Sequence, residues 1–507
     1  MFPISAWIAL LWITLLVGVW SFIYLFGTKR SKGRLPPGPP GIPILGNLLM
    51  LGDLPHQALY KLAMKYGPIM HIRLGLVPAV IVSSPQAAQQ FLKKHDLVFA
   101  SRPITEVGKY ISYNCKGLAF SPYGTYWRNV RKLCTLELLS NLKIESFRSM
   151  RKEELSLLVE TLMDSARAHT AVDVSAKVAS FYLQMTCRMV FGRKYMEENL
   201  DNRGFKAVVN ELLVLIGSFN AAEYIPFAGA LDVQGIRRRM KAINKVFSDF
   251  FDKIIDEHLQ DREIRHQKDF VDFMLSFMES NNNEFQIDRT NIKAIILEML
   301  VGATDTSATV IEWALSELIK HPRVLKKVQE ELDSVVGMDR MVEESDLTNL
   351  EYLDMVVKET MRLHPVLPLL VPHEAMEDCM VNDFYIPKNS RVIINAWAIG
   401  RDPNAWPNAG EFYPERFIGA SIDVKGHDFQ LLPFGSGRRG CPGMQLGVTV
   451  VRLAVAQLIH CFDWELPNGV RPDDLDMSER FSLVIPRANS LLAIPTYRLR
   501  LKQQFVN

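Results

Sequence analysis

Residues 434–443 read Phe-Gly-Ser-Gly-Arg-Arg-Gly-Cys-Pro-Gly and place one cysteine, Cys441, in a glycine-rich loop. A thiolate is a strong ligand for a haem iron, and it survives as an anion only where positive charge and backbone N–H donors lie close to it. The glycines let the backbone pass close to a flat ring system, and Arg439 is spaced to reach a carboxylate of the same cofactor. The loop therefore predicts that Cys441 is the axial ligand of a haem iron.

The spacing Phe-x-x-Gly-x-Arg-x-Cys-x-Gly resembles the haem-thiolate loop of the cytochrome P-450 superfamily. This resemblance implies a mainly helical fold with a small β lobe, haem b as the cofactor, and Phe434 and Arg439 among the residues that bind it. A single cysteine in a glycine-rich loop is more often an inert thiol. The identification therefore depends on whether other segments of the chain match the family in the same order.

The length and composition of the chain describe an ordinary globular protein. The 507 residues alone would suggest about three domains of roughly 150 residues each. The resemblance implies instead one catalytic domain over residues 44–507. Hydrophobic residues make up 48%, charged residues 22%, and the net charge is +2, which argues against nucleic-acid binding. The six cysteines show no disulfide-framework spacing, as expected of reduced thiols in the cytosol.

The amino-terminal segment predicts a single transmembrane helix. Residues 4–26 carry no charge and would span about 35 Å as a helix. Four basic residues follow at once, Lys29, Arg30, Lys32 and Arg34. Because the positive flank stays cytosolic, we expect a signal anchor in the endoplasmic reticulum membrane with a cytosolic catalytic domain. The alternative is a buried core helix.

Residues 27–43 form a basic and proline-rich hinge. The stretch 35–43 reads Leu-Pro-Pro-Gly-Pro-Pro-Gly-Ile-Pro. Repeated proline removes N–H donors and fixes φ, so we expect a stiff, extended spacer and no helix. The stretch resembles the proline-rich hinge of microsomal cytochromes P-450. Taken alone, it could also be a docking peptide for a proline-binding module.

Hydrophobic periodicity predicts a mainly helical body. Helical patterns cover residues 141–165, 236–260 and 290–320, and short β-like runs cover residues 69–74 and 79–82. The body reads as one unit, since no repeat and no long charge run divides it.

The middle of the longest predicted helix, residues 301–307, resembles the oxygen-activating segment of the same superfamily. Small residues at Gly302 and Ala303 leave room for a flat cofactor and dioxygen, where the family more often has Ala/Gly-Gly. Thr306 offers a hydroxyl and Asp305 a proton source, so the match makes this acid–alcohol pair catalytic. Without the cysteine loop, ordinary helix packing would be the better interpretation.

Two further segments resemble the structural triad that fixes the cysteine loop. Glu359 and Arg362 lie three residues apart on one predicted helix, and Arg416 follows in Pro-Glu-Arg-Phe. An exposed pair of this kind would contribute little to stability. The match implies that these three residues are structural and not catalytic.

Three more residues are candidate haem contacts. Trp127 and Arg131 are four residues apart, so an indole N–H and a guanidinium share one helical face and each can bind a propionate. Pro-His-Glu at residues 372–374 resembles the family segment whose basic residue, here His373, binds the other propionate. A tryptophan with a basic neighbour is common, so the order of motifs along the chain supports these assignments.

The motifs together resemble plant microsomal cytochromes P-450 of specialised metabolism over nearly all of residues 36–500. The resemblance implies monooxygenation of an apolar terpenoid, alkaloid or phenolic, with electrons that NADPH supplies through a cytochrome reductase. Residues expected to contact substrate are apolar: 366–371, Ile295, Met299 and 481–484. Arg128 and Lys132 are offset from the propionate face, and we expect them to dock the reductase.

Two other functions stay open at this point. The first is a haem-thiolate isomerase or dehydratase, which would need no proton relay. The second is a non-enzymatic membrane carrier of haem or sterol, which would have no use for an acid–alcohol pair beside the iron.

Overall fold

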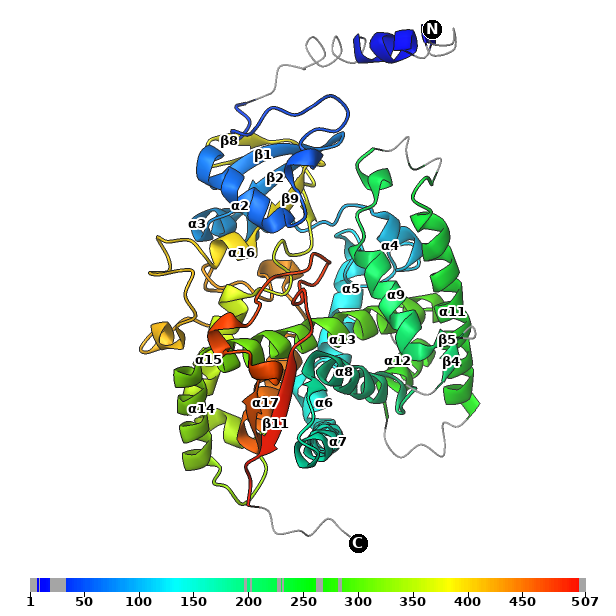
Figure 1. The fold of residues 1–507 in the computed structure, drawn as a ribbon. Coiled ribbons are helices and arrows are strands. Elements are labelled where there is room, and N and C mark those ends of the chain that lie inside the picture. Colours follow the sequence, from blue (N-terminus) through cyan, green and yellow to red (C-terminus); the bar gives the residue numbers. More distant parts are fainter. Residues whose placement is uncertain are drawn as a thin grey trace.

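The computed structural model describes residues 7–8, 10–18, 33–195, 198–200, 203–225, 229, 232–260, 268–280 and 285–500. Within this part the chain is mainly helical with small sheets, as the sequence predicted (Figure 1). The longer helices are α2 (Pro55–Tyr66), α5 (Thr125–Leu133), α7 (Arg148–Arg167), α8 (Val174–Phe191), α9 (Phe205–Gly217), α11 (Ile236–Gln260), α12 (Phe270–Glu279), α13 (Arg289–Lys320), α14 (Pro322–Val335), α15 (Glu351–Leu363) and α17 (Met444–Cys461). The shorter ones are α3 (Pro85–Gln89), α4 (Glu106–Tyr110), α6 (Asn141–Ser146) and α16 (Ala396–Ile399).

A four-stranded sheet forms the lobe at the top of Figure 1. Its order is β1 (Ile69–Leu74), β2 (Val77–Val82), β9 (Arg391–Ile394) and β6 (His373–Glu374). Gly75 closes the β1–β2 hairpin with φ +60°, a conformation that side-chain-bearing residues rarely adopt. β9 then pairs with β2 in parallel, so segments far apart in the sequence share one sheet. Side chains of α2 cover one face and those of α3 the other, which buries β2 and β9 on both faces.

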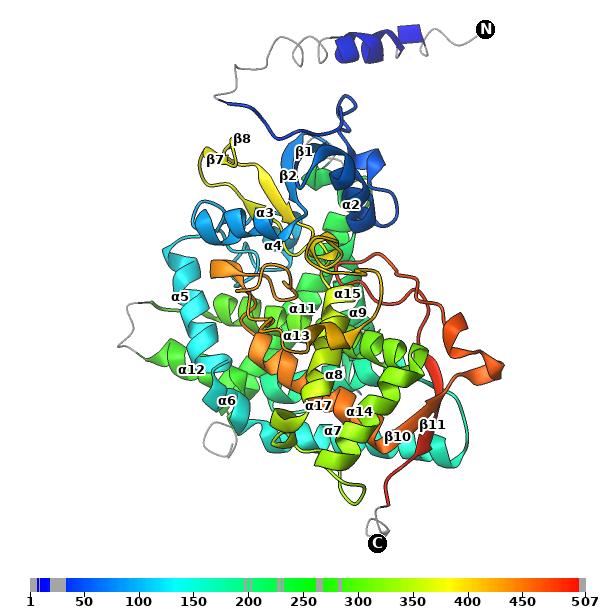
Figure 2. The same ribbon diagram turned by 90° about the vertical axis from the view of Figure 1, so that its left-hand side faces the viewer.

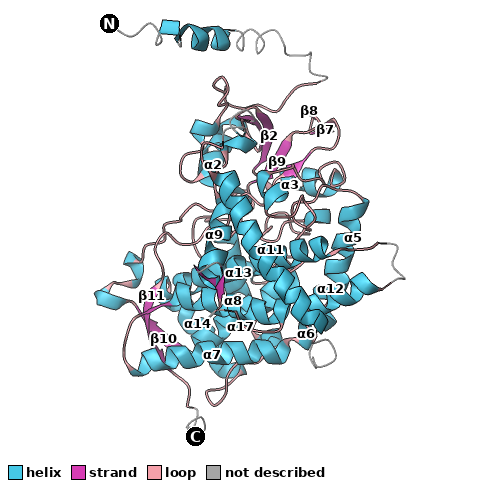
Figure 3. Ribbon diagram, turned by 90° about the vertical axis from the view of Figure 1, so that its right-hand side faces the viewer, coloured by secondary structure: helices cyan, strands magenta, loops and turns pink. Residues whose placement is uncertain are grey.

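The remaining strands lie in three places (Figures 1 and 3). β10 (Phe462–Glu465), β11 (Leu492–Tyr497) and β3 (Val172–Asp173) form a sheet at the edge of the helical body. The pair β7 (Cys379–Val381) and β8 (Phe384–Ile386) extends the upper lobe, and β4 (Asn199–Leu200) pairs with β5 (Arg203–Gly204) beside the helices.

Helix α13 runs through the centre of the helical body and packs against α8, α15 and α17 (Figures 1 and 2). By length and composition alone, three described helical stretches could cross a bilayer: Phe205–Glu223, Arg289–Lys320 and Met444–Cys461. For α13 and α17 the apolar composition has another cause, since both contribute a large share of the buried core. A helix that is covered on all sides needs apolar residues on all sides.

The predicted elements agree with the structure except at one helix. α11 and α13 match the predicted ranges to within one residue, and β1 covers its predicted range fully. The pattern at residues 141–165 is two helices, α6 and α7, because Phe147 leaves the helical conformation (φ −96°, ψ 7°). Its buried ring packs edge-on against Phe270 at 5.8 Å. Tertiary packing therefore interrupts a helix that periodicity alone continues.

The anchor predicted at residues 4–26 lies largely outside the described residues. Residues 7–8 and 10–18 are helical, and their large apolar side chains are exposed. The described part of the proline-rich hinge is extended and lies against the upper lobe. His71 N–H donates to the Pro37 carbonyl (2.9 Å), and a Cβ at Gly38 would lie 1.8 Å from the His71 carbonyl oxygen. The hinge is therefore fixed to the sheet by backbone contacts that tolerate no side chain at that glycine.

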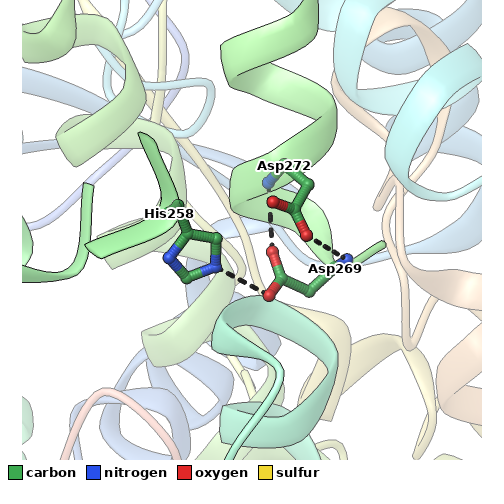
Figure 4. Close-up of side chains that lie close together, drawn as sticks. All are labelled: His258, Asp269 and Asp272. Carbon is green, nitrogen blue, oxygen red and sulfur yellow. Dashed lines mark hydrogen bonds and ion pairs between the residues drawn. The ribbon is translucent and has the colours of Figure 1, made fainter. Parts of the chain in front are cut away.

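A buried histidine joins α11 to the start of α12 (Figure 4). His258 Nδ1 lies 2.7 Å from the Ile254 carbonyl, and Nε2 lies 2.8 Å from Asp269 Oδ2, so both ring nitrogens face oxygen acceptors. Asp269 and Asp272 each accept the other's backbone N–H and form a capping box. The possible metal-ligating atoms of the three side chains lie within 4.8 Å of one another. The helix cap and the contacts of the His258 ring account for this geometry.

Candidate active site

The cysteine loop is held in a tight backbone conformation before α17. Cys441 N–H donates to the Phe434 carbonyl (2.9 Å), and Gly437 has φ +67° with its Cα facing the Leu92 carbonyl, 2.6 Å from where a Cβ would sit. The Cys441 side chain is accessible to solvent although protein surrounds it closely. Burial raises the pKa of its thiol, while the backbone N–H of Gly443 and the charge of Arg131 lower it. An iron ion at this thiol would complete the stabilisation of the thiolate.

Residues 301–307 of α13 lie beside this loop. A Cβ at Gly447, in the first turn of α17, would lie 3.7 Å from both Ser307 Oγ and a ring carbon of Phe434. Gly302 is exposed in the middle of a helix whose neighbouring residues are partly or fully buried, and a Cβ there would meet nothing within 4 Å. The Thr306 hydroxyl donates to the Gly302 carbonyl (2.7 Å). The chain thus leaves room at Gly302 and holds a hydroxyl one turn away.

Three arginines converge on the same region without any acidic partner among the described residues. Arg439 donates to the Ala100 (2.6 Å) and Ser121 (2.7 Å) carbonyls, and Arg131 donates to the Gly440 carbonyl (2.8 Å). Burial, with the charge of Arg131, lowers the pKa of Arg439 to about 9. Backbone carbonyls solvate these guanidinium groups but leave their charge uncompensated.

Arg102 is the third of these arginines and was not predicted from the sequence. It donates to the Pro372 carbonyl (3.0 Å), and its buried Nε has no hydrogen-bond partner among the described residues. Burial and the charge of Arg439 lower its pKa. Burial of His373, together with the charge of Arg102, lowers the pKa of its imidazole. Its Nδ1 lies 2.8 Å from the Phe99 carbonyl. The loop Ser101-Arg102-Pro103 carries no motif, so only the fold could reveal this residue.

This buried cationic cluster fits the two propionates of a haem. The structure brings Trp127, Arg131, His373 and Arg439 together as the sequence suggested, and Arg102 joins them. Arg439 lies over the Trp127 ring at 4.2 Å, while the indole N–H donates to the Leu118 carbonyl (3.1 Å). Carboxylates would supply the charge and the acceptor that the cluster lacks.

Glu298 is a second residue that the sequence did not reveal. This buried carboxylate on α13 accepts the Ser112 hydroxyl (2.6 Å) and the backbone N–H groups of Leu118 (2.5 Å) and Ala119 (2.8 Å). Burial raises its pKa. A Cβ at Gly117 would lie 2.1 Å from the carboxylate, so a larger residue there would displace the Glu298 side chain. Since the Leu118 carbonyl accepts from Trp127, Glu298 positions the loop that orients a candidate haem contact.

Glu359, Arg362 and Arg416 form a buried network on the cysteine side of the fold. Arg362 donates two hydrogen bonds to Glu359 (2.7 and 2.8 Å), and Arg416 Nε donates to the same carboxylate (2.9 Å). Arg362 also donates to the Ala409 (2.8 Å) and Glu411 (3.0 Å) carbonyls. The network ties α15 to the long loop after α16, which is a structural arrangement.

A cavity of about 1050 Å³ lies between the upper lobe and the helical body. Most of its walls are apolar, and they include residues 369–371 and 481–483 from the stretches expected to contact substrate. Val366, Leu367 and Val484, from the same stretches, do not line it. On α13, Ile295 is fully buried in the helical core and Met299 is partly buried, and neither lines the cavity. Helical periodicity placed them on the stripe of Thr306, but neighbouring helices cover that end of the stripe.

Comparison with known proteins agrees with this geometry. The cytochrome P-450 family model matches residues 36–493. The chain is 53% identical to cytochrome P-450 CYP736A12 of Panax ginseng, over 98% of this chain and 100% of that protein. It is 44% identical to cytochrome P-450 750A1 of Pinus taeda (94% and 95%) and 46% identical to cytochrome P-450 71A1 of Persea americana (87% and 89%). The chain therefore belongs to the cytochrome P-450 family of haem-dependent monooxygenases.

Proposed function

We propose that this protein is a membrane-bound haem-thiolate monooxygenase that oxidises an apolar plant metabolite, a terpenoid, alkaloid or phenolic. The observation that carries the proposal is the accessible Cys441 thiol in a loop that packs near Ser307 of α13, a helix with an open position at Gly302, and a buried cationic cluster close to that loop. The large apolar cavity and the plant relatives support the substrate class. Electrons reach plant members of the family from NADPH through a reductase.

Residues from several segments of the chain would hold haem b. Cys441 would bind the iron through its thiolate, and Phe434 would pack beside the cofactor. The propionates would bind the cationic cluster formed by Arg102, Arg131 and Arg439, with Trp127 and the neutral His373 beside it. When bound, the haem supplies activation of dioxygen, which thiolate donation favours. The chain orients the substrate, excludes water and supplies protons.

Asp305 and Thr306 are proposed to move those protons. Burial raises the pKa of Asp305, and the charge of Arg480 opposes that shift. A carboxyl group with a raised pKa holds its proton closer to neutral pH, so it can both give and regain one during turnover. The Thr306 hydroxyl lies one residue away. While its hydrogen is donated to the Gly302 carbonyl, its oxygen can accept a hydrogen bond and so position a proton donor; to pass its own proton on, it would have to release the Gly302 carbonyl.

Replacing Thr306 by alanine is expected to uncouple the enzyme and retain haem. Product formed per NADPH should fall by about 10-fold or more, with hydrogen peroxide released in its place. The measurement compares NADPH consumed, peroxide and product. Thr304→Ala is the matched control, because its hydroxyl donates to the Leu300 carbonyl in the same way but is buried. Unchanged coupling in Thr306→Ala would contradict the assignment.

The two other functions considered from the sequence have less support. An isomerase or dehydratase would turn over without NADPH and would gain nothing from Asp305 and Thr306. A haem or sterol carrier is at odds with membership of a monooxygenase family over nearly the whole chain. Dependence of turnover on NADPH and reductase separates both from the proposed activity.

The reductase is proposed to dock beside α5. Arg128 and Lys132 are exposed on this helix, while Trp127 is buried and Arg131 faces the cysteine loop. Reversing both charges to glutamate should slow reductase-supported turnover several-fold at low salt, because rim charges act on association rate. Peroxide-driven turnover and haem content should not change.

Charge reversal at Lys326 is the control for this experiment, since its exposed side chain lies on α14, away from α5 in Figures 1 and 2. Equal loss in the reductase and peroxide assays would indicate damage to haem binding. No loss in either assay would refute a docking role for the pair.

Membrane attachment is proposed through the amino-terminal segment, with the catalytic domain in the cytosol. The exposed apolar side chains of residues 10–17 and the basic residues that follow support a signal anchor. Protease added to sealed microsomes should digest the catalytic domain and leave a small membrane-protected fragment. A protected catalytic domain would overturn this topology.

A further inference from the structure

One cation in the wall of the large cavity has no side-chain hydrogen bond or ion pair among the described residues. Arg480 lines the cavity together with its neighbours Phe481, Ser482 and Leu483. Its guanidinium forms no hydrogen bond and no ion pair with any residue that the structure describes, and the side chain is exposed. The cavity walls are otherwise mostly leucine, isoleucine, valine, proline and phenylalanine.

The other basic side chain near the cavity mouth is already engaged. Arg391 lies 3.8 Å from the Glu223 carboxylate, donates to the Glu223 carbonyl (3.3 Å) and stacks on the Tyr224 ring at 5.0 Å. Arg102 belongs to the cationic cluster and donates to backbone carbonyls. Arg480 is therefore the lining cation, within the described part of the chain, whose charge is available to a ligand in this cavity.

The backbone that carries Arg480 is fixed. The Glu479 side chain accepts from Gln57 Nε2 (2.8 Å), contacts His56 Nε2 (2.8 Å) and accepts from the Trp397 indole (3.2 Å). Arg480 N–H itself donates to the Pro486 carbonyl (3.1 Å), which closes a turn around the segment. The Glu479 carboxylate is thus directed into the protein, and the next residue, Arg480, is presented to the cavity.

An apolar substrate that fills the cavity would remove water from this guanidinium. An unpaired charge without water is strongly unfavourable, whereas a carboxylate can accept two hydrogen bonds from arginine in a fixed planar geometry. We infer that Arg480 selects an apolar substrate that carries one carboxylate. The inference rests on the proposed function and narrows its substrate class.

A competing role for Arg480 is to lower the pKa of Asp305 on α13. Arg480 is close enough for its charge to lower the pKa of that carboxyl group, although the two side chains form no ion pair. If this were its whole purpose, the loss of Arg480 would change proton delivery with any substrate and would leave substrate binding unaltered. The two roles therefore predict different results from one variant.

The test uses the full-length, haem-loaded protein in detergent and two matched probe pairs, dodecanoic acid with methyl dodecanoate and abietic acid with methyl abietate. Binding is followed by calorimetric titration and by the haem spin-state change. The decisive quantity is the acid-to-ester affinity ratio, because partition of the probes into detergent is the same for every variant. Arg480→Gln should lower this ratio by about 10-fold, and Arg480→Lys should keep most of it.

Two controls separate charge recognition from general effects. Phe481→Leu should change acid and ester binding by the same factor, and Arg471→Gln, far more exposed on a surface turn, should change neither. An unchanged ratio in Arg480→Gln, or unchanged binding with more peroxide released, would overturn the inference. A wild-type protein without the haem-thiolate absorbance band would refute the proposed function itself, which is a separate outcome.

Discussion

Serine in place of Cys441 is expected to abolish the red-shifted absorbance band of the reduced carbon monoxide complex, and turnover with it. A serine hydroxyl stays protonated at neutral pH, so it gives the iron no anionic sulfur donor. The loop itself should persist, because its fixed contacts are backbone ones, including the Cys441 N–H bond to the Phe434 carbonyl. The measurement is the carbon monoxide difference spectrum together with haem content.

The matched control is Cys379→Ser, which changes a half-buried cysteine on β7 that lies 3.5 Å from His95. This variant should keep both the band and the activity. Survival of the band in Cys441→Ser would show that another residue holds the iron, and the proposed site would be wrong.

Replacing Arg362 by alanine should lower the free energy of unfolding by about 3–5 kcal/mol, since it leaves the Glu359 carboxylate buried with half its partners. Both members of this pair have fully buried side chains. The loss should also release haem, because the network anchors the long loop after α16. Urea unfolding followed by circular dichroism and by haem absorbance measures both effects.

Arg471→Ala is the matched control, because Arg471 and Asp474 form a pair at the same three-residue spacing on an exposed turn. That change should leave the unfolding midpoint unaltered. If the two variants unfolded at the same urea concentration, the burial of the Arg362 network would have no energetic consequence, and its structural role would be refuted.

The sequence by itself determined the features that short stretches encode. The loop around Cys441 carries its own turn glycines and its own charge, and α13 shows a long apolar period with small residues at Gly302 and Ala303. The helical ranges of α11 and the strand range of β1 follow from the same local signals. Local chemistry sufficed there because each of these features is formed by residues that are neighbours in the chain.

Only the tertiary structure decided the parts that depend on distant segments. The partner of the Trp127 indole is a carbonyl that Glu298 of α13 positions, and Arg102 reaches the cationic cluster from a loop without a motif. Packing around Phe147 divided a helix that periodicity continued, and the segments around α13 buried Ile295 in the core. The cavity also depends on tertiary structure, since its walls come from segments that are far apart in the sequence. Arg480 lines the cavity for the same reason. Long-range packing decides which side chains come into contact, and the periodicity of the sequence does not encode those contacts.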